Sequence, residues 1–189
     1  MHEFVPLLDP DDLPPDLRAQ YDATTRPGLR DFILMMGHAP DHFRRYNEAY
    51  APLRFDNHLG PRMTEIVRLA VSQTTRCPVC MAGRVPAATD AGLTEDLIAS
   101  LCTSKRDGFT DAEGALLDFT LKFATDHLSI TDADRDALRT HFTPTQIVEI
   151  GLLAAMCLVG RFSQIAGLEE PTLREIAGLE PESPQDQPR

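Results

Sequence analysis

The fold is decided by residues 62–80, which read RMTEIVRLAVSQTTRCPVC. Apolar side chains recur here at the three- and four-residue intervals of an α-helix, so that one stripe contains Ile66, Val67, Ala70 and Val71. The pattern predicts a helix over residues 62–75 that turns this stripe towards a hydrophobic core. Two cysteines follow directly after the predicted helix, at positions 77 and 80.

Helical spacing continues from Leu29 onward, and no segment combines apolar and polar alternation with the turn signals of a hairpin. A second core-facing helix is indicated by Ala112, Leu116, Phe119, Phe123 and Ala124. Short connections between such helices favour antiparallel packing. The sequence therefore predicts an all-α fold, a bundle of several helices.

Threonine and glycine set the expected helix boundaries. Thr110 and Thr143 each stand three residues before a glutamate or glutamine, which is the pattern of a capping box. Two further helices are expected to be capped by Thr94 and Thr131. Glycines fall where two helices are expected to end, at positions 92 and 108.

The chain is expected to divide into three parts. Residues 1–28 are rich in proline and acidic side chains, and are expected to form an arm with one short helix near residues 17–24. Residues 29–179 carry the helical pattern and are expected to form the domain. Residues 180–189 contain three prolines and no large apolar side chain, so we expect a disordered tail that cannot offset the entropy cost of ordering.

The overall charge argues against some classes of partner. With 29 acidic and 18 basic residues, the formal net charge is −11. Such a charge repels polyanions, so we expect neither nucleic acid nor an anionic membrane surface as a partner. The first residues, MHEFVP, lack the basic and apolar regions of a signal peptide, and a cytoplasmic location is expected.

The longest apolar run covers residues 150–160. It has about half of the roughly 20 residues that a helix needs to cross a bilayer, so we interpret it as a buried helix. Because this helix is apolar on nearly every side, a domain of this size hides it with difficulty unless a second subunit covers one face. A homo-oligomer is therefore expected.

Cys77 and Cys80 form a CxxC pair at a predicted helix start. There the helix dipole and the free amide groups stabilise a thiolate, which suits reversible dithiol chemistry. Pro78 is tolerated in the first turn of such a helix, and Arg84, four residues after Cys80, is expected to add a positive charge on the same face. A lone CxxC pair is also compatible with half of a zinc site or with two inert thiols.

A zinc site would need a second close pair of ligands. Cys102 and Cys157 are isolated in apolar surroundings, where a free cysteine behaves as a small hydrophobic residue, and structural roles are expected for both. The six histidines show no ligand spacing within a predicted helix. We therefore expect no metal ion and no cofactor, and assign the chemistry to the CxxC pair.

Glu65 is the remaining candidate, as a proton acceptor in an otherwise apolar helix. Alternatively, it is a solvated acid in the first turn of that helix. In a straight helix Glu65 would lie about 18 Å from Cys77 at a rise of 1.5 Å per residue, too far for direct proton transfer. A chain reversal near Arg76, or a second subunit, is needed to bring the two together.

Residues 65–73, EIVRLAVSQ, followed by the CxxC pair, resemble the alkylhydroperoxidase D-like (AhpD-like) branch of the carboxymuconolactone decarboxylase superfamily. Further family landmarks are similar at residues 38–40, 91–94 and 147–150, so the resemblance covers roughly residues 30–165. It implies an AhpD-like, all-helical oligomer that acts as a thiol-dependent hydroperoxide reductase or a disulfide oxidoreductase. The substrate would be a small-molecule hydroperoxide, and the reductant a thioredoxin-like or lipoyl thiol.

The resemblance also implies a role for each site residue. Cys80 attacks the peroxide, Cys77 donates a proton and resolves the sulfenic acid as a disulfide, and Glu65 belongs to the proton relay. The sequence departs from the family pattern at two positions, because Arg84 stands where the relay histidine is expected and Val79 where a histidine or tyrosine is usual.

These departures bear on the activity. Arginine stabilises an anion but does not shuttle protons near neutral pH, since its pKa is about 12.5 or higher. Slow peroxidase activity or a pure disulfide-exchange role follows. One alternative is a redox-sensing or scaffold oligomer without turnover. A more distant one is a lactone decarboxylase, against which the presence of both cysteines argues.

Overall fold

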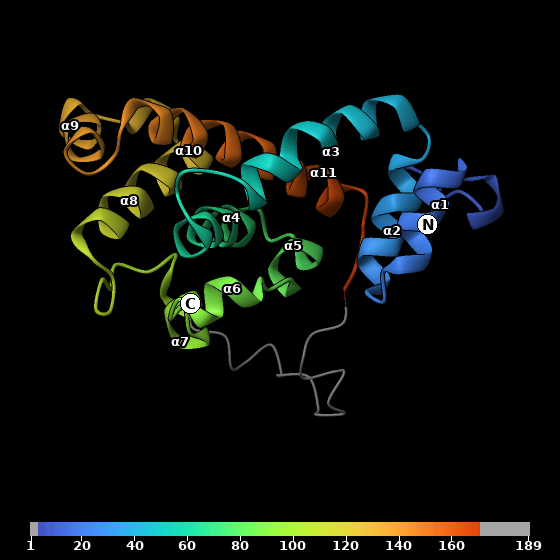
Figure 1. Cartoon of the computed structure of the whole chain (residues 1–189), viewed down its shortest axis with the longest axis horizontal. Helices are drawn as coiled ribbons and strands as arrows, with labels where there is room; N and C mark the ends of the chain where they lie inside the picture. The colour runs from blue at the N-terminus through green and yellow to red at the C-terminus, as the bar shows by residue number, and fades with distance from the viewer. Residues whose placement is uncertain (1–3, 171–189) are drawn as a thin grey trace.

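All regular elements in residues 4–170, the part of the chain that the computed structural model describes, are helices (Figure 1). The predicted all-α fold is confirmed. The predicted tail, residues 180–189, lies outside the described residues, as do residues 171–179. In chain order the elements are η1 (Pro10–Asp12), α1 (Pro15–Ala23), α2 (Pro27–Met36), α3 (Pro40–Phe55), α4 (Pro61–Thr75), α5 (Pro78–Ala82), α6 (Pro86–Asp90), α7 (Glu95–Ser100), α8 (Asp111–Thr125), η2 (His127–Ser129), α9 (Asp132–His141), α10 (Pro144–Cys157) and α11 (Val159–Ile165).

Helix α4 forms the centre of the molecule (Figure 1). It packs against α8 and α10, and on its other sides against α3, α5, α6 and α11. The stripe predicted to face the core has no exposed surface: Ile66, Val67, Ala70 and Val71. Burial of each isoleucine or valine side chain stabilises the fold by roughly 1.5–3 kcal/mol. The site that follows α4 is therefore attached to the most deeply buried helix.

The predicted helix starts are confirmed. Capping boxes close the first turns of α8, α9 and α10, and a threonine side chain caps α7; the four residues are Thr110, Thr131, Thr143 and Thr94. Gly92 follows α6 with a φ of 84°, where a side chain would be strained. Gly108 does not end a helix, because α7 already ends at Ser100 and position 108 lies in the loop before α8.

Helices α1 and α2 lie at one end of the molecule, far from α8 and α9 (Figure 1). They share a small separate core of Leu17, Ile33 and Leu34, which Leu13 after η1 and Phe43 from α3 complete. Helix α3 extends from this end to the central helices (Figure 1). The short helix predicted near residues 17–24 is α1, and the predicted boundary between residues 28 and 29 falls inside α2.

The apolar run near the C-terminus is divided between two helices, because α10 ends at Cys157 and α11 begins at Val159. One side of α10 packs against α3, α4 and α8. On another side Val148 and Leu152 are 60% and 51% exposed, so the prediction of a buried helix holds for one side only. By length and composition alone, Pro144–Ile165 is apolar enough to cross a membrane, a test that core helices of soluble proteins also pass.

Candidate active site

A chain reversal at Arg76 sets the position of the two cysteines. Arg76 ends α4 in the left-handed conformation, with a φ of 51°. The amide of Cys77 then donates to the carbonyl oxygen of Ser72 at 3.2 Å, which turns the chain back along α4. Of the two arrangements considered for Glu65 and Cys77, a chain reversal or a second subunit, the chain contains the reversal, and α5 packs beside α4 instead of continuing beyond its end.

The cysteine pair forms the first turn of α5. Cys77 is the N-cap, and its Sγ accepts a hydrogen bond from the Cys80 amide at 3.3 Å. The two Sγ atoms lie 2.7 Å apart, and both thiols are free. Since a disulfide bond is about 2.05 Å long, a movement of less than about 1 Å joins them. Cys77 is fully buried, whereas Cys80 is partly exposed.

Ionisation of the reduced pair favours Cys77. The pKa of Cys77 is lowered to about 7, because the Cys80 thiol, the Cys80 and Val79 amides and the Ser163 hydroxyl donate to its sulfur and outweigh the effect of burial. The same bond between the thiols, together with burial, raises the pKa of Cys80, and Arg68 opposes that rise. As the pH rises through about 7 the pair therefore gains one negative charge, shared along the hydrogen bond between the two sulfurs.

Glu65 reaches the cysteine turn through Arg68. Both carboxylate oxygens of Glu65 accept from the Arg68 guanidinium at 2.7 Å, and both side chains are almost fully buried. Arg68 also donates to the carbonyl oxygens of Cys80 at 2.6 Å and Gly83 at 2.7 Å. Glu65 is thus a buried member of a network and not a solvated first-turn acid.

Arg68 is not among the predicted site residues. Its position gives a signal nevertheless, because it follows Glu65 by three residues and is the only polar residue in the stretch 66–71. Two opposite charges at that spacing share a helix face. When the whole helix is buried, such a pair must be buried with it, and a buried charge needs further hydrogen-bond partners.

The side chain of Arg84 forms an ion pair with Glu95, with two hydrogen bonds of 2.7 and 2.9 Å. It does not line the cavity beside Cys80, and the arginine whose charge acts on Cys80 is Arg68. The structure therefore does not bring Arg84 together with the cysteines. The physical reason is that α5 ends at Ala82 and Gly83 is extended, so the helical spacing that would align Arg84 with Cys80 is lost.

Cys80 opens onto a cavity of about 590 Å³. Its walls come from α1 and the turn after it, and from α2, α3, α4, α5, α10 and α11. Helix α3 contributes the largest share, which is Phe43, Tyr46, Asn47, Tyr50, Ala51, Arg54 and Phe55. Cys77 is not part of the wall, so a molecule in the cavity meets Cys80 first.

The other two cysteines differ in their surroundings. Cys157 lies in the cavity wall, with its Sγ 3.7 Å from the Tyr50 hydroxyl, and burial raises its pKa to about 11. Cys102 is exposed beyond the end of α7, so the prediction of apolar helical surroundings is wrong there. Within residues 4–170 no group of three or more His, Cys, Asp and Glu side chains is placed to hold a metal ion.

Comparison with known proteins relates this architecture to a family. The carboxymuconolactone decarboxylase family model matches residues 40–119. A search of curated proteins gave no significant match. Among solved structures, an uncharacterized peroxidase-related protein from Ralstonia eutropha JMP134, described as an alkylhydroperoxidase AhpD core, is 24% identical over 94% of this chain and 96% of that chain, with a TM-score of 0.72.

Two further solved structures share the fold. The debrominase Bmp8 in complex with 2,3,4-tribromopyrrole is 19% identical over 90% of this chain and 93% of its own, with a TM-score of 0.70. A putative antioxidant defence protein AhpD from Agrobacterium tumefaciens is 21% identical over 70% of this chain and 91% of its own, with a TM-score of 0.60. These comparisons relate residues 40–119 to the carboxymuconolactone decarboxylase family and show an AhpD-like arrangement of helices over most of the chain.

Proposed function

We propose that the chain is a thiol-dependent oxidoreductase that reduces organic hydroperoxides with the Cys77–Cys80 pair. The observation that carries the proposal is the 2.7 Å separation of two free sulfur atoms at the start of α5, one of which lines the 590 Å³ cavity. The similar solved structures add support, because they include a peroxidase-related protein and a debrominase.

The first step is attack by the Cys80 thiolate on the hydroperoxide. Cys77, where the negative charge rests in the reduced pair, takes the Cys80 proton across the hydrogen bond. An S–O bond then forms at Cys80 and the O–O bond breaks, which leaves a sulfenic acid and an alkoxide. The alkoxide takes the proton from Cys77 and departs as an alcohol, so Cys77 is again a thiolate.

The second step closes the disulfide. The Cys77 thiolate attacks the Cys80 sulfur, an S–S bond forms, and hydroxide leaves. An external dithiol, such as a thioredoxin or a lipoyl group, then reopens the disulfide by exchange and becomes oxidised itself. Buried Cys77 suits the resolving role, because the only atom it has to reach is the sulfur of Cys80.

Arg68 and Glu65 act together in this proposal. Arg68 is the fixed positive charge that lowers the cost of a negative charge on Cys80 during attack. Glu65 holds Arg68 in place, and since both of its oxygens already accept from Arg68, it serves as a positioning residue instead of a proton carrier. The proton moves between the two sulfurs, so no relay histidine is required.

Consumption of cumene hydroperoxide tests the proposal, with thioredoxin or reduced lipoamide as the electron donor. We expect turnover in the parent protein and none in Cys80→Ser. In Cys77→Ser we expect one oxidation that stops at the sulfenic acid, which dimedone labelling detects. Cys102→Ser is the matched control, because Cys102 lies outside the cavity. Equal activity in the parent and all three variants would remove the proposal.

Reductive dehalogenation of an aromatic compound is a second candidate. It is favoured by the aromatic part of the cavity wall, Phe32, Phe43, Tyr46, Tyr50 and Phe55, and by the structural likeness to the debrominase Bmp8. The Cys80 thiolate would attack the halogen, the ring carbon would take a proton, and Cys77 would displace halide as the disulfide forms. Halide release from a bromopyrrole without consumption of hydroperoxide would favour this candidate.

The two remaining alternatives give different results in the same assays. A redox sensor forms the disulfide with peroxide but shows no turnover with any dithiol donor. A lactone decarboxylase consumes its lactone equally well in the parent and in Cys80→Ser, since that reaction does not use the cysteine pair.

A further inference from the structure

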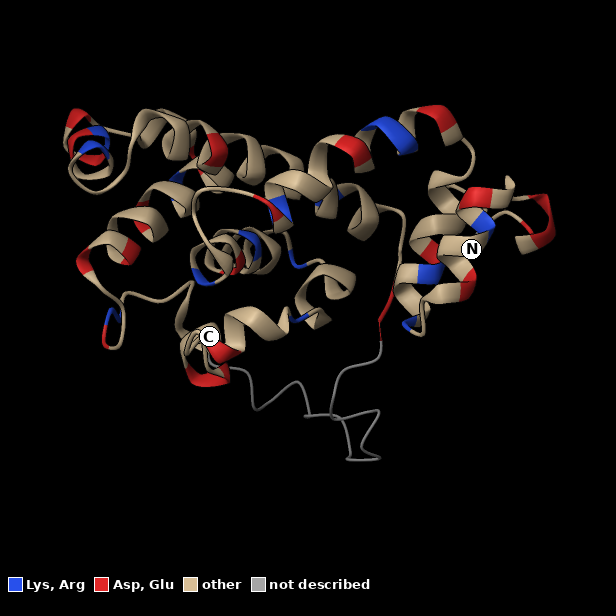
Figure 2. Cartoon of the chain, viewed as in Figure 1, with Lys and Arg blue, Asp and Glu red and all other residues tan. Residues whose placement is uncertain are grey.

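The cavity beside Cys80 has a charge opposite to that of the chain. Arg26, Arg54 and Arg68 line it and no aspartate or glutamate does, although the formal net charge is −11. Figure 2 shows acidic residues on outer elements such as η1 and α9, and none on α5. A concave site lined by one sign of charge concentrates ligands of the other sign.

Two of the three arginines already have their partners. Arg68 is bidentate to Glu65 and also donates to two carbonyl oxygens of the cysteine turn. Arg26 pairs with Glu170 at 3.1 Å and donates to the carbonyl oxygen of Val79. All three nitrogens of Arg68 donate in these contacts, and Arg26 keeps only Nη1 without a hydrogen-bond partner among the described residues.

Arg54 differs from the other two. Its Nε is buried without a hydrogen-bond partner within the described residues. Its contact with Glu65 is 3.6 Å, longer than a hydrogen bond, because Arg68 occupies both oxygens of that carboxylate. The Phe55 ring lies 5.0 Å from the Arg54 guanidinium carbon and holds the group over an apolar surface. Arginine has five N–H donors, so Arg54 retains the capacity to bind an acceptor.

We propose that the cavity binds organic acids, with the ligand carboxylate on Arg54 and the apolar body against the aromatic wall. At the cavity wall, Arg54 and Arg68 against Glu65 leave one positive charge. The thiolate charge of the reduced pair rests on Cys77, which is buried outside that wall, so a ligand carboxylate can pair with Arg54. The volume of about 590 Å³ is in the roughly 300–1,000 Å³ range of sites for small organic ligands. This inference rests on the proposed function, and it makes the substrate a hydroperoxide that carries a carboxylate.

A matched pair of substrates tests the inference: cumene hydroperoxide with a para-carboxylate, and the methyl ester of the same compound. We expect the KM of the parent protein to be about tenfold lower for the acid, the effect of a charge-assisted hydrogen bond. Arg54→Gln should raise the KM for the acid much more than that for the ester, and so remove most of the roughly tenfold preference. If Arg54→Gln slows turnover of the acid and of the ester by the same factor, Arg54 acts on the thiolate and not on the substrate. That result overturns the inference.

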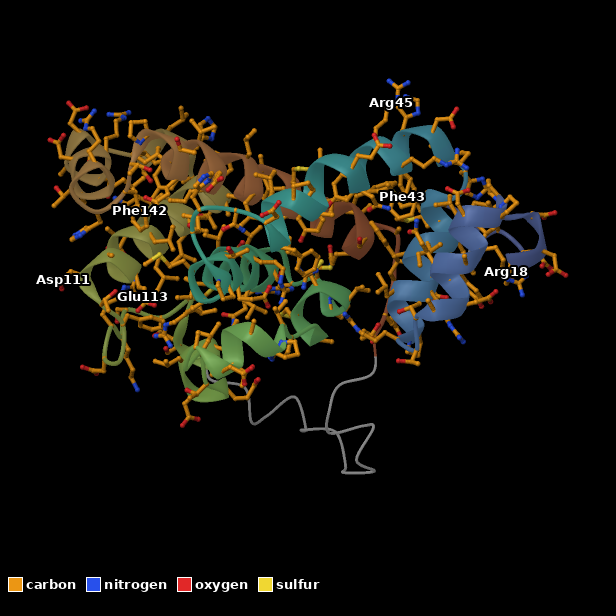
Figure 3. All side chains as sticks on the ribbon, in the orientation of Figure 1. Arg18, Phe43, Arg45, Asp111, Glu113 and Phe142 are labelled. Atoms are coloured by element: carbon orange, nitrogen blue, oxygen red, sulfur yellow. The ribbon has the colours of Figure 1, made fainter. Side chains whose placement is uncertain are left out.

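Arg45→Gln is the control variant. Figure 3 shows Arg45 pointing away from α3 on the outside of the molecule, with Phe43 on the inner side of the same helix. The variant removes the same charge from the same helix without touching the cavity, and should keep the preference for the acid. Arg54→Lys keeps the positive charge but loses the paired N–H donors that bind a carboxylate at both oxygens. It should therefore keep only part of the preference for the acid over the ester. If Arg54→Gln does not fold, the ratio of the two KM values in Arg54→Lys is compared with that in the parent protein. An unchanged ratio then overturns the inference.

Binding of unreactive ligands separates this inference from the proposed function. Calorimetry compares para-isopropylbenzoate with the neutral para-isopropylbenzamide. Tighter binding of the benzoate, lost in Arg54→Gln, supports the inference even if the protein consumes no hydroperoxide. Equal affinity for the two compounds, or no binding of either, overturns it even if the protein reduces hydroperoxides.

Discussion

The guanidinium of Arg68 donates to the carbonyl oxygen of Cys80 at 2.6 Å. Because the same guanidinium is bidentate to Glu65, the buried ion pair of α4 fixes the turn that carries the thiols. Taking two charges out of water is costly, and the cost is offset only when every donor and acceptor finds a partner. Here the carbonyl oxygens of the cysteine turn are those partners, so the ion pair and the active site depend on one another.

Loss of Arg68 is predicted to destabilise the fold. Arg68→Met leaves the buried Glu65 with no hydrogen-bonded cation and only the 3.6 Å contact to Arg54, and we expect the free energy of unfolding to fall by up to about 3–5 kcal/mol in urea denaturation. Adding Glu65→Leu to Arg68→Met should recover much of the lost stability, since the buried carboxylate is then removed as well. A double variant as unstable as Arg68→Met would contradict the assignment of the loss to the unpaired carboxylate.

The reactivity of the pair is predicted to depend on pH with a midpoint near 7. The pKa of Cys77 is lowered to about 7, so the thiolate fraction rises as the pH increases through that value and falls below it. The ultraviolet absorbance of the thiolate measures this midpoint in the reduced protein without requiring access to the buried Cys77. Ser163→Ala should move it to higher pH, because one donor to the Cys77 sulfur is lost. A midpoint at about 8.5, the value of a free cysteine, would contradict the geometry.

Helix α11 is predicted to set the position of Cys77 through Gly160. A Cβ atom on Gly160 would lie 2.9 Å from Cys77 Cβ and 3.3 Å from Cys77 Sγ, so one of the two segments has to move. We expect Gly160→Ala to cost about 1–3 kcal/mol of stability and to slow disulfide formation. Gly151→Ala in α10, where nothing lies within 4 Å, should be neutral or stabilise by up to about 1 kcal/mol. Equal effects in the two variants would contradict this account.

A homo-oligomer is proposed from the exposed side of α10. Val148 and Leu152 lie one turn apart and are 60% and 51% exposed, an arrangement that a second copy would cover. Leu152→Asp should then shift the protein towards the monomer in sedimentation velocity. Leu128→Asp is the control, since Leu128 is 85% exposed on η2. A monomeric parent, or the same response in both variants, would argue against this interface.

Local signals in the sequence predicted the helices. The capping boxes at Thr110 and Thr143 and the stripe of α4 depend on neighbours within one or two turns. The reversal at Arg76 was only one of two possibilities, because the distance between Glu65 and Cys77 in a straight helix could also have been overcome by a second subunit. The capping boxes and the apolar stripe are present in the structure as predicted, because each depends on residues close in the sequence.

The placement of Arg84 and the cavity was not predictable in the same way. The helical spacing from Cys80 to Arg84 assumes that α5 continues, yet the extended Gly83 ends it after five residues. The cavity wall joins Arg26, Tyr50 and Cys157, which are far apart in the chain and meet only through the packing of α2, α3 and α10. The periodicity of a single segment does not predict which residues of different helices line one cavity.

The most direct test of the central claim is the mass of the reduced protein after one equivalent of hydroperoxide. We predict the loss of two hydrogen atoms, mapped by peptide analysis to a Cys77–Cys80 disulfide and reversed by dithiothreitol. Retention of both thiols, or a disulfide that involves Cys102 or Cys157 instead, would contradict the account.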